Sequence, residues 1–303
     1  MSMDLTEQET EWAHAIKEAL ASKDSELANK ITDFEYAHHA IIAKEKVDRA
    51  LKRIQRLDTF RQEHDIPPAT EIHAEDALQM IQRFSAICPG IYMAFGKHST
   101  INSTSTEGDG DAKEESHYVS TWDYSAFLPV NIATPEDWKT CVASFYYLLD
   151  ACHPDITAMR NGLVMLTEAQ GLGWKNFSLE MEKRAAHLYQ DAYPVRYQAM
   201  IMLHPPKIFE AMYALVKPFL NKKIKDCIQL SGNLEQVQAK FTKEVLPTTM
   251  GGTQTQEDME QAMLEALKTR YANMASFKLP EKGHKGPAPL VPTTNEYEDE
   301  VET

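Results

Sequence analysis

The sequence contains no long apolar run. No stretch of its 303 residues approaches the ~18 to 20 consecutive apolar positions that a helix needs to cross a bilayer. The first residues are acidic and lack the apolar core of a secretory signal. The four cysteines show no CxxC spacing, and without a signal peptide they are expected to be reduced thiols. These absences predict a cytoplasmic protein without disulfides.

Basic residues are in the minority. Lys and Arg number 31 against 45 Asp and Glu, which gives a formal net charge of −14. Nucleic acids and anionic membranes both require a basic face, so we expect no nucleic-acid partner and no strong non-specific adhesion to membranes. Any contact with an anionic membrane must therefore be local and transient, and would make the protein peripheral rather than integral.

Catalytic and metal-binding patterns are also missing. The chain has no GxSxG elbow, no GxxxxGK[ST] loop, no GxGxxG after a strand and no zinc-binding spacing. The adjacent His38 and His39 would point about 100° apart on a helix, and no further ligand follows them. We therefore expect neither an enzyme nor a bound metal or cofactor.

The first 70 residues have the pattern of a helical region. Thr6 and Glu9 form a capping box, and further helices are predicted over 31–44 and from 46 to the proline pair at 67–68. The last of these helices carries a set of basic residues: Arg49, Lys52, Arg53, Arg56 and Arg61. They either form a solvated face or contribute to a surface for anionic lipid.

Predicted strands and helices alternate over residues 71–253, which is typical of an α/β protein. The predicted strands cover 91–95, 118–127, 163–166, 199–203 and 227–230. The polar segment 98–117 is predicted to be a loop or disordered insertion. A capped helix is predicted within 254–278, and the Pro-rich acidic residues 279–303 form a disordered tail that is either inert or an interaction segment.

Residues 193–230 lie at the centre of this pattern. A strand, a Pro-Pro turn, an amphipathic helix and a second strand form a βαβ unit, which normally belongs to a mostly parallel sheet. Pro218 should kink or divide the helix because it removes a backbone donor. Periodicity alone favours ordinary core packing for the apolar face of this helix rather than the wall of a cavity.

Two blocks of this sequence resemble the CRAL-TRIO lipid-binding domain family. One block has YP at 193–194, KPFL at 217–220 with a basic run after it, and LPxxxGG at 246–252; the other runs from the NG at 161–162 to the GW at 173–174. The resemblance covers roughly 33–253, including the small helical region before the domain. It implies a mixed, mostly parallel sheet flanked by helices that enclose an apolar pocket, with 206–220 as a mobile gate.

The resemblance also implies a function and a pocket. The protein would bind a hydrophobic lipid and carry or transfer it between membranes; the alternative is an interaction or scaffold module of the same fold, with unknown protein partners. Three methionines would add adaptable, unbranched surface. The implied pocket and gate residues are Leu166, Met200, Met202, Ile208, Phe209, Met212, Tyr213, Val216, Phe219 and Leu220.

A basic patch is expected beside the gate. Its residues are Arg196, Lys217, Lys222, Lys223 and Lys225. They either attract an anionic leaflet, at about 1 kcal/mol per charge near the surface, or are solvated lysines that complement a helix dipole. In tocopherol and retinal carriers of the family, basic residues at the positions of Arg196 and Lys223 bind phosphoinositide headgroups. Val195 replaces the acidic residue of phosphatidylinositol-transfer relatives, which argues against phosphatidylinositol as the cargo.

Three residues depart from the family pattern. Glu168 stands where the family usually has Asp, His204 replaces the Asn of the turn before the gate, and Met250 replaces an aromatic residue before the GG. All three lie at expected turn or hinge positions.

Overall fold

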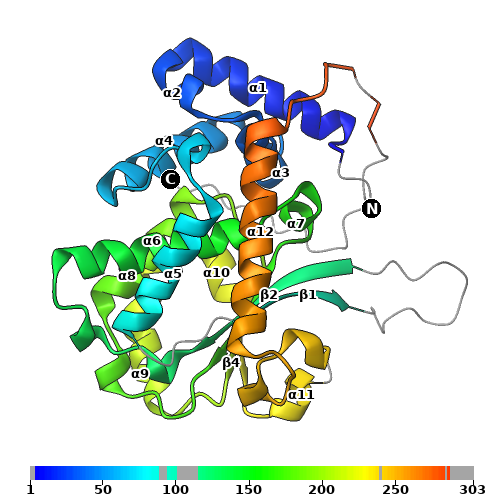
Figure 1. The fold of residues 1–303 in the computed structure, drawn as a ribbon. Helices are drawn as coiled ribbons and strands as arrows, with labels where there is room; N and C mark the ends of the chain where they lie inside the picture. Colours follow the sequence, from blue (N-terminus) through cyan, green and yellow to red (C-terminus); the bar gives the residue numbers. More distant parts are fainter. Residues whose placement is uncertain (1–3, 89–93, 101–114, 239–240, 284, 287–303) are drawn as a thin grey trace, which may run out of the picture.

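The computed structural model describes residues 4–88, 94–100, 115–238, 241–283 and 285–286 (Figure 1). A central sheet is covered by a layer of helices, and the N-terminal helices lie together at the top of the view. In the described part of the chain, no helix is both long enough and apolar enough to cross a membrane.

The sheet has five strands in the order of the chain. They are β1 (Ala94–Thr100), β2 (Glu115–Asp123), β3 (Leu163–Glu168), β4 (Tyr197–Leu203) and β5 (Ile228–Ser231). The first pair is antiparallel, and the pairings from β2 to β5 are parallel. The expectation of an α/β protein with a mixed, mostly parallel sheet is therefore confirmed.

The first two strands differ from their predicted bounds. Residues 91–93 lie outside the described part, while β1 and β2 both extend into the polar segment 98–117 that the sequence assigns to a loop. Strand pairing satisfies the hydrogen bonds of the backbone whatever the side chains are. A strand of polar residues at the edge of a sheet therefore lacks the apolar alternation from which strands are predicted. After Asp123 the chain turns in a 3₁₀ segment, η2 (Tyr124–Ala126), where the sequence predicts continued strand.

Four helices form the N-terminal region: α1 (Glu7–Lys23), α2 (Ser25–Lys30), α3 (Asp33–Ala43) and α4 (Val47–Glu63). The capping box of Thr6 and Glu9 is present, and Thr32 and Glu35 make a second one at the start of α3. These helices bury a core of their own. Its largest members are Ile16, Leu20, Tyr36, Leu51 and Ile54.

The helices on one face of the sheet build the main core. They are α5 (Ala74–Ile87), α6 (Pro135–Cys152), α7 (Ile156–Asn161), α8 (Leu179–His187) with a π-helical turn η5 (Leu188–Ala192), and α12 (Gln256–Ser276). The long α12 crosses this layer in Figure 1 and contacts both α5 and α6. On the other face, α11 (Leu234–Gln238) and the segment 241–250 cover a second apolar cluster.

The central βαβ unit forms with one addition. As Pro218 predicts, the amphipathic helix α9 (Ile208–Val216) ends before the proline and continues as a 3₁₀ turn, η6 (Lys217–Phe219). The basic run that follows forms a further short helix, α10 (Lys222–Cys227), which the sequence does not predict. Parallel pairing of β4 with β5 then closes the unit.

The tail from residue 279 begins with ordered residues, unlike the prediction. The Leu279 amide donates to Asp33 at 3.1 Å, and the Pro280 carbonyl lies 2.8 Å from His14 Nε2. Leu279 also packs against the apolar cores of the molecule, which explains why a Pro-rich segment is held here. Residues 287–303 lie outside the described part.

Candidate functional site

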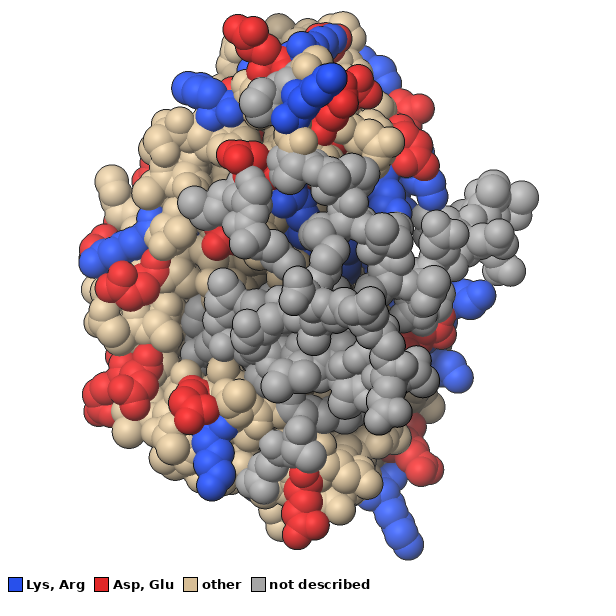
Figure 2. All heavy atoms as spheres, turned by 90° about the vertical axis from the view of Figure 1, so that its right-hand side faces the viewer, with Lys and Arg blue, Asp and Glu red and all other residues tan. Residues whose placement is uncertain are grey.

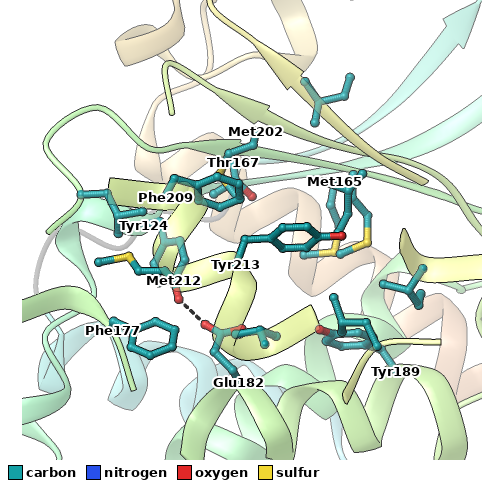
Figure 3. A pocket seen from close by; sticks show the side chains of 17 residues that line it. Tyr124, Met165, Thr167, Phe177, Glu182, Tyr189, Met202, Phe209, Met212 and Tyr213 are labelled. Atoms are coloured by element: carbon teal, nitrogen blue, oxygen red, sulfur yellow. Dashed lines mark hydrogen bonds between the residues drawn. The ribbon is translucent and has the colours of Figure 1, made fainter. Parts of the chain in front are cut away.

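A cavity of about 110 Å³ lies between α9 and the sheet (Figure 3). Neighbouring strands supply paired residues to it, with Met165 opposite Met200 and Thr167 opposite Met202. The other lining residues are Tyr124, Leu172, Phe177, Glu182, Tyr189, Ile201, Phe209, Met212, Tyr213, Val216, Leu220, Ile224 and Ile228. An almost entirely apolar wall of this kind suits a hydrophobic ligand.

The structure brings together seven of the ten pocket and gate residues inferred from the sequence: Met200, Met202, Phe209, Met212, Tyr213, Val216 and Leu220. Three others lie elsewhere. Leu166 is fully buried on the opposite face of the sheet, beside Val119 and Val164, because side chains alternate along a strand. Ile208 is partly buried at the start of α9 and packs on a small apolar cluster rather than lining the cavity.

Phe219 points away from the cavity. Its side chain is 46% exposed, and the Lys183 ammonium lies 4.4 Å from the centre of its ring. This geometry is a cation–π contact between α8 and η6. Leu215, on the outer side of α9, is equally exposed. Helix α9 and η6 therefore present apolar side chains to solvent as well as to the cavity.

Tyr124 and Glu182 line the cavity, and no sequence motif predicts that they meet there. The Tyr124 hydroxyl donates a hydrogen bond to Glu182 Oε1, drawn as the dashed line in Figure 3. Burial raises the pKa of the Glu182 carboxyl, and the bond from Tyr124 offsets part of that rise. Burial and the nearby Glu182 charge both raise the pKa of Tyr124, so it stays a neutral phenol. Among the described lining residues there is no Lys, Arg or His.

Two of the departures from the family pattern contact each other. The imidazole Nδ1 of His204 lies 3.0 Å from Glu168 Oε2, so the ends of β3 and β4 are joined where the gate begins. His204 has a φ of +48°, a left-handed conformation that is uncommon for a residue with a side chain. Its amide also donates to the Ser231 carbonyl at 2.8 Å, which ties the turn to β5.

Gln190 holds the segment that follows α9. Its side-chain amide donates to the Phe219 carbonyl at 3.0 Å, and its side-chain oxygen accepts from the Asn221 amide at 2.6 Å. One side chain of the π-helical turn thus spans the junction between η6 and α10. The segments on both sides of α9 are fixed by hydrogen bonds, and the helix itself packs through its apolar side chains.

The structure brings two predicted patch residues to helix α4. Burial and the charges of Arg196, Arg49 and Arg53 lower the pKa of Lys223 to about 8. Lys223 nevertheless is exposed at the surface. We call Arg49, Arg53, Arg196 and Lys223 the cationic cluster. The sequence shows the α4 pair and the Arg196–Lys223 pair as separate basic sets, and no sequence pattern predicts that they come together.

Arg53 is the buried member of the cationic cluster, at 8% exposure. Its Nη2 donates to the Gln190 carbonyl at 3.3 Å, while Nε and Nη1 have no hydrogen-bond partner among the described residues. Burial and the Arg49 charge lower the pKa of Arg53 to about 10. These two N–H groups are buried, and both the Asp191 carboxylate and further cations lie near them.

The remaining patch residues lie apart from the cationic cluster. Lys217 and Lys222 are exposed, and Lys225 is partly buried. The face shown in Figure 2 has acidic and basic side chains interspersed around its visible margin, outside the grey residues. The described part of that face that is visible therefore carries no broad basic surface.

Known proteins match the region that forms this site. The CRAL/TRIO domain family matches residues 87–252, more than half of the chain. Human tyrosine-protein phosphatase non-receptor type 9 is 29% identical over 109 residues, which are 36% of this chain and 18% of that protein. Human alpha-tocopherol transfer protein-like is 27% identical over 131 residues, 42% of this chain and 37% of that protein. The chain thus spans well under half the length of these relatives.

A solved structure of Sfh5 covers 84% of this chain and 86% of its own, with a TM-score of 0.47 and 12% sequence identity.

Proposed function

The chain belongs to the CRAL/TRIO family of lipid-binding and lipid-transfer domains, and we propose that it binds a hydrophobic lipid under α9 and carries it between membranes. The observation that carries the proposal is the cavity itself. Its walls are the methionines of β3 and β4 and the inner face of α9, which includes Phe209 and Met212. These flexible, apolar side chains can adapt to a ligand without leaving polar groups unpaired.

The size of the cavity supports a moving gate. At about 110 Å³ it is smaller than an engineered cavity of ~150 Å³ that binds benzene, and far below the ~300–1,000 Å³ of ordinary ligand pockets. A lipid therefore needs α9 to move outward. The two ends of α9 are natural hinges, because the short segments at His204 and at Lys217–Phe219, where Gln190 binds, can absorb backbone rotation while the helix stays intact.

The outer surface of the gate suits contact with a membrane. Leu215 and Phe219 are each 46% exposed, and Lys217 lies between them in the chain with its side chain in solvent. Apolar side chains flanked by a cation favour the boundary between headgroups and acyl chains. Insertion of these residues would offset the cost of drawing α9 away from the cavity.

The cationic cluster supports recognition of a phosphoinositide headgroup at the same membrane. A phosphate group beside the exposed Lys223 would relieve the mutual repulsion of the four cations. Lys223 is at the surface and does not line the cavity, so headgroup and cargo need not be the same molecule.

The test is transfer of a labelled hydrophobic lipid between vesicles by the purified full chain. Transfer should be faster to acceptor vesicles that contain phosphoinositide. Lys223→Glu should weaken binding to these vesicles by about 2 kcal/mol, since it changes two unit charges at about 1 kcal/mol each. Lys222→Glu makes the same change outside the cationic cluster and should have a smaller effect. No uptake across a broad lipid panel would exclude the proposed function.

The small cavity also favours a second function, an interaction module in which the protein's own side chains fill the pocket. Mass spectrometry of lipids that co-purify with the native protein separates the two. A stoichiometric lipid supports the carrier, and a lipid-free protein with an unchanged pocket supports the interaction module.

A further inference from the structure

We propose that acidic residues late in the sequence bind the cationic cluster and compete there with an anionic membrane. We call residues 296–302 the acidic run, which contains Glu296, Glu298, Asp299, Glu300 and Glu302. The inference rests on the proposed membrane contact and adds its regulation by a segment of the same chain. Two observations carry it: the place where the described tail ends, and the charge of the surface near that place.

The described part of the tail forms a strap on helix α1 (Figure 1). The strap follows α12, and its Pro280 carbonyl lies 2.8 Å from His14 Nε2. Gly286 contacts the residue before the cap of α1, because a Cβ added to this glycine would lie 2.0 Å from the Leu5 carbonyl oxygen. Residues 279–286 therefore end beside the start of α1, and the rest of the tail continues from that point.

The start of α1 is joined to the cationic cluster through Arg160. The Nη2 group of Arg160 donates to the Asp4 carbonyl at 2.7 Å. The carbonyl of Arg160 in turn accepts from Arg196 Nη1 at 2.9 Å. Since Asp4 is the chain neighbour of Leu5, the route from Gly286 to the cluster crosses one peptide unit and one arginine residue.

The chain between the strap and the acidic run is long enough for this route. Glu296 is ten residues beyond Gly286. An extended chain covers at most ~3.3–3.6 Å per residue, or about 35 Å over this stretch. A tether of this length keeps the acidic run at an effective concentration on the order of millimolar near the cluster. Weak contacts are then sufficient for binding within one molecule.

The described carboxylates near the cationic cluster balance its charge only in part. Asp191 acts on Arg53, and Glu9 acts on Arg196. Both carboxylates also pair with arginines outside the cluster. Four cations thus share two carboxylates that have other partners, which leaves a local positive charge in a chain that is acidic as a whole.

The exposed members of the cluster give the acidic run a place to bind. Arg49 and Lys223 both have their side chains at the surface, on α4 and α10. Carboxylates form charge-assisted hydrogen bonds with such cations. Each exposed pair is weak and screened by salt, so the bound run would exchange readily with solvent. A membrane rich in phosphate groups can therefore displace it.

The first test is carbodiimide cross-linking of the purified full chain without lipid, followed by mass spectrometry of its peptides. A carbodiimide joins a lysine amine to a carboxylate that touches it. The main product should join Lys223 to the acidic run within one molecule, and high salt should reduce it at least about fivefold. Products at Lys207 and Lys243, which are exposed elsewhere, measure random contact. A Lys223 product no stronger than these, or one found between two molecules, overturns the proposal.

The second test compares binding of two charge-matched variants to phosphatidylcholine vesicles with and without phosphoinositide. The tail variant neutralises four acids of the run: Glu296→Gln, Glu298→Gln, Asp299→Asn and Glu300→Gln. The control variant neutralises four exposed acids elsewhere: Glu71→Gln, Glu136→Gln, Glu235→Gln and Glu244→Gln. If the run covers the cluster about two thirds of the time, the tail variant should bind phosphoinositide vesicles about threefold more tightly than the control variant.

The outcomes separate this inference from the proposed function. Equal affinity of the tail and control variants overturns the competition, while binding of the wild type to phosphoinositide vesicles still supports the membrane contact. A strong Lys223 product with no vesicle binding by the wild type or either variant overturns the membrane contact, and with it the competition. The Lys223 product together with tighter binding by the tail variant supports both.

Discussion

The ion pair of Glu35 and Arg61 should contribute strongly to the attachment of the N-terminal helices. Glu35 Oε1 lies 2.7 Å from Arg61 Nη2, and the two side chains are 4% and 6% exposed. Arg61 also donates to the Tyr146 hydroxyl, at 2.6 Å from Nη2 and 3.1 Å from Nε. Helices α3, α4 and α6 therefore meet at one guanidinium group. Although burial opposes it, the Arg61 charge holds the pKa of Glu35 below its usual value.

Breaking this pair from one side should be costly. Glu35→Leu leaves the Arg61 charge buried without its partner, and such losses cost about 3–5 kcal/mol. Arg61→Met leaves the Glu35 carboxyl in the same position and should cost about as much. The double variant should cost clearly less than either single variant, because no unpaired charge remains buried.

Urea unfolding of the purified full chain at pH 7, followed by circular dichroism, measures these differences. Lys30→Met is the control, since it breaks an exposed pair with Glu26 at 3.0 Å and should leave the urea midpoint almost unchanged. Single variants that each cost less than about 1 kcal/mol, or costs that simply add in the double variant, would refute the reasoning.

Two further predictions concern acid and backbone packing. Stability should fall as the pH drops below 6.5, because burial lowers the pKa of His38, His39 and His153 in the folded chain. For His153 the pKa falls to about 3. The unfolded chain binds these protons first, so each histidine removes roughly 1.4 kcal/mol between pH 7.5 and 5.5, and an unchanged urea midpoint would contradict this. Gly252→Ala should cost about 1–3 kcal/mol or more in the same assay, because its Cβ would lie 1.9 Å from the Leu246 carbonyl oxygen. Gly232→Ala, with open space around it, should be close to neutral.

The sequence predicts the elements whose causes are local. Thr6, Thr134 and Thr255 each begin a helix with the capping box that their spacing indicates. Pro218 divides the gate helix because a missing backbone donor acts within one turn. Helix caps and helix-breaking prolines depend on a few neighbouring residues, so the sequence predicts them correctly here.

Relations between distant segments are harder to predict. Leu166 lies on the face of β3 opposite to the cavity, and Met165 and Thr167 take the positions expected for it. The orientation of a buried strand cannot be inferred from a run that is apolar throughout. Glu182 belongs to an ordinary amphipathic helix, so its place in the cavity follows only from the packing of α8 against η2 and α9.

The basic residues of α4 show the same limit and lead to a mechanical consequence. Read as a helix face, they are either solvated or directed at lipid, yet Arg53 and Arg61 are buried and serve different partners. Arg53 donates to the backbone of Gln190, whose side chain bonds to the Phe219 carbonyl and the Asn221 amide just after α9. If α9 moves as proposed, the motion is therefore coupled to helix α4 through a single hydrogen-bonded residue, Gln190.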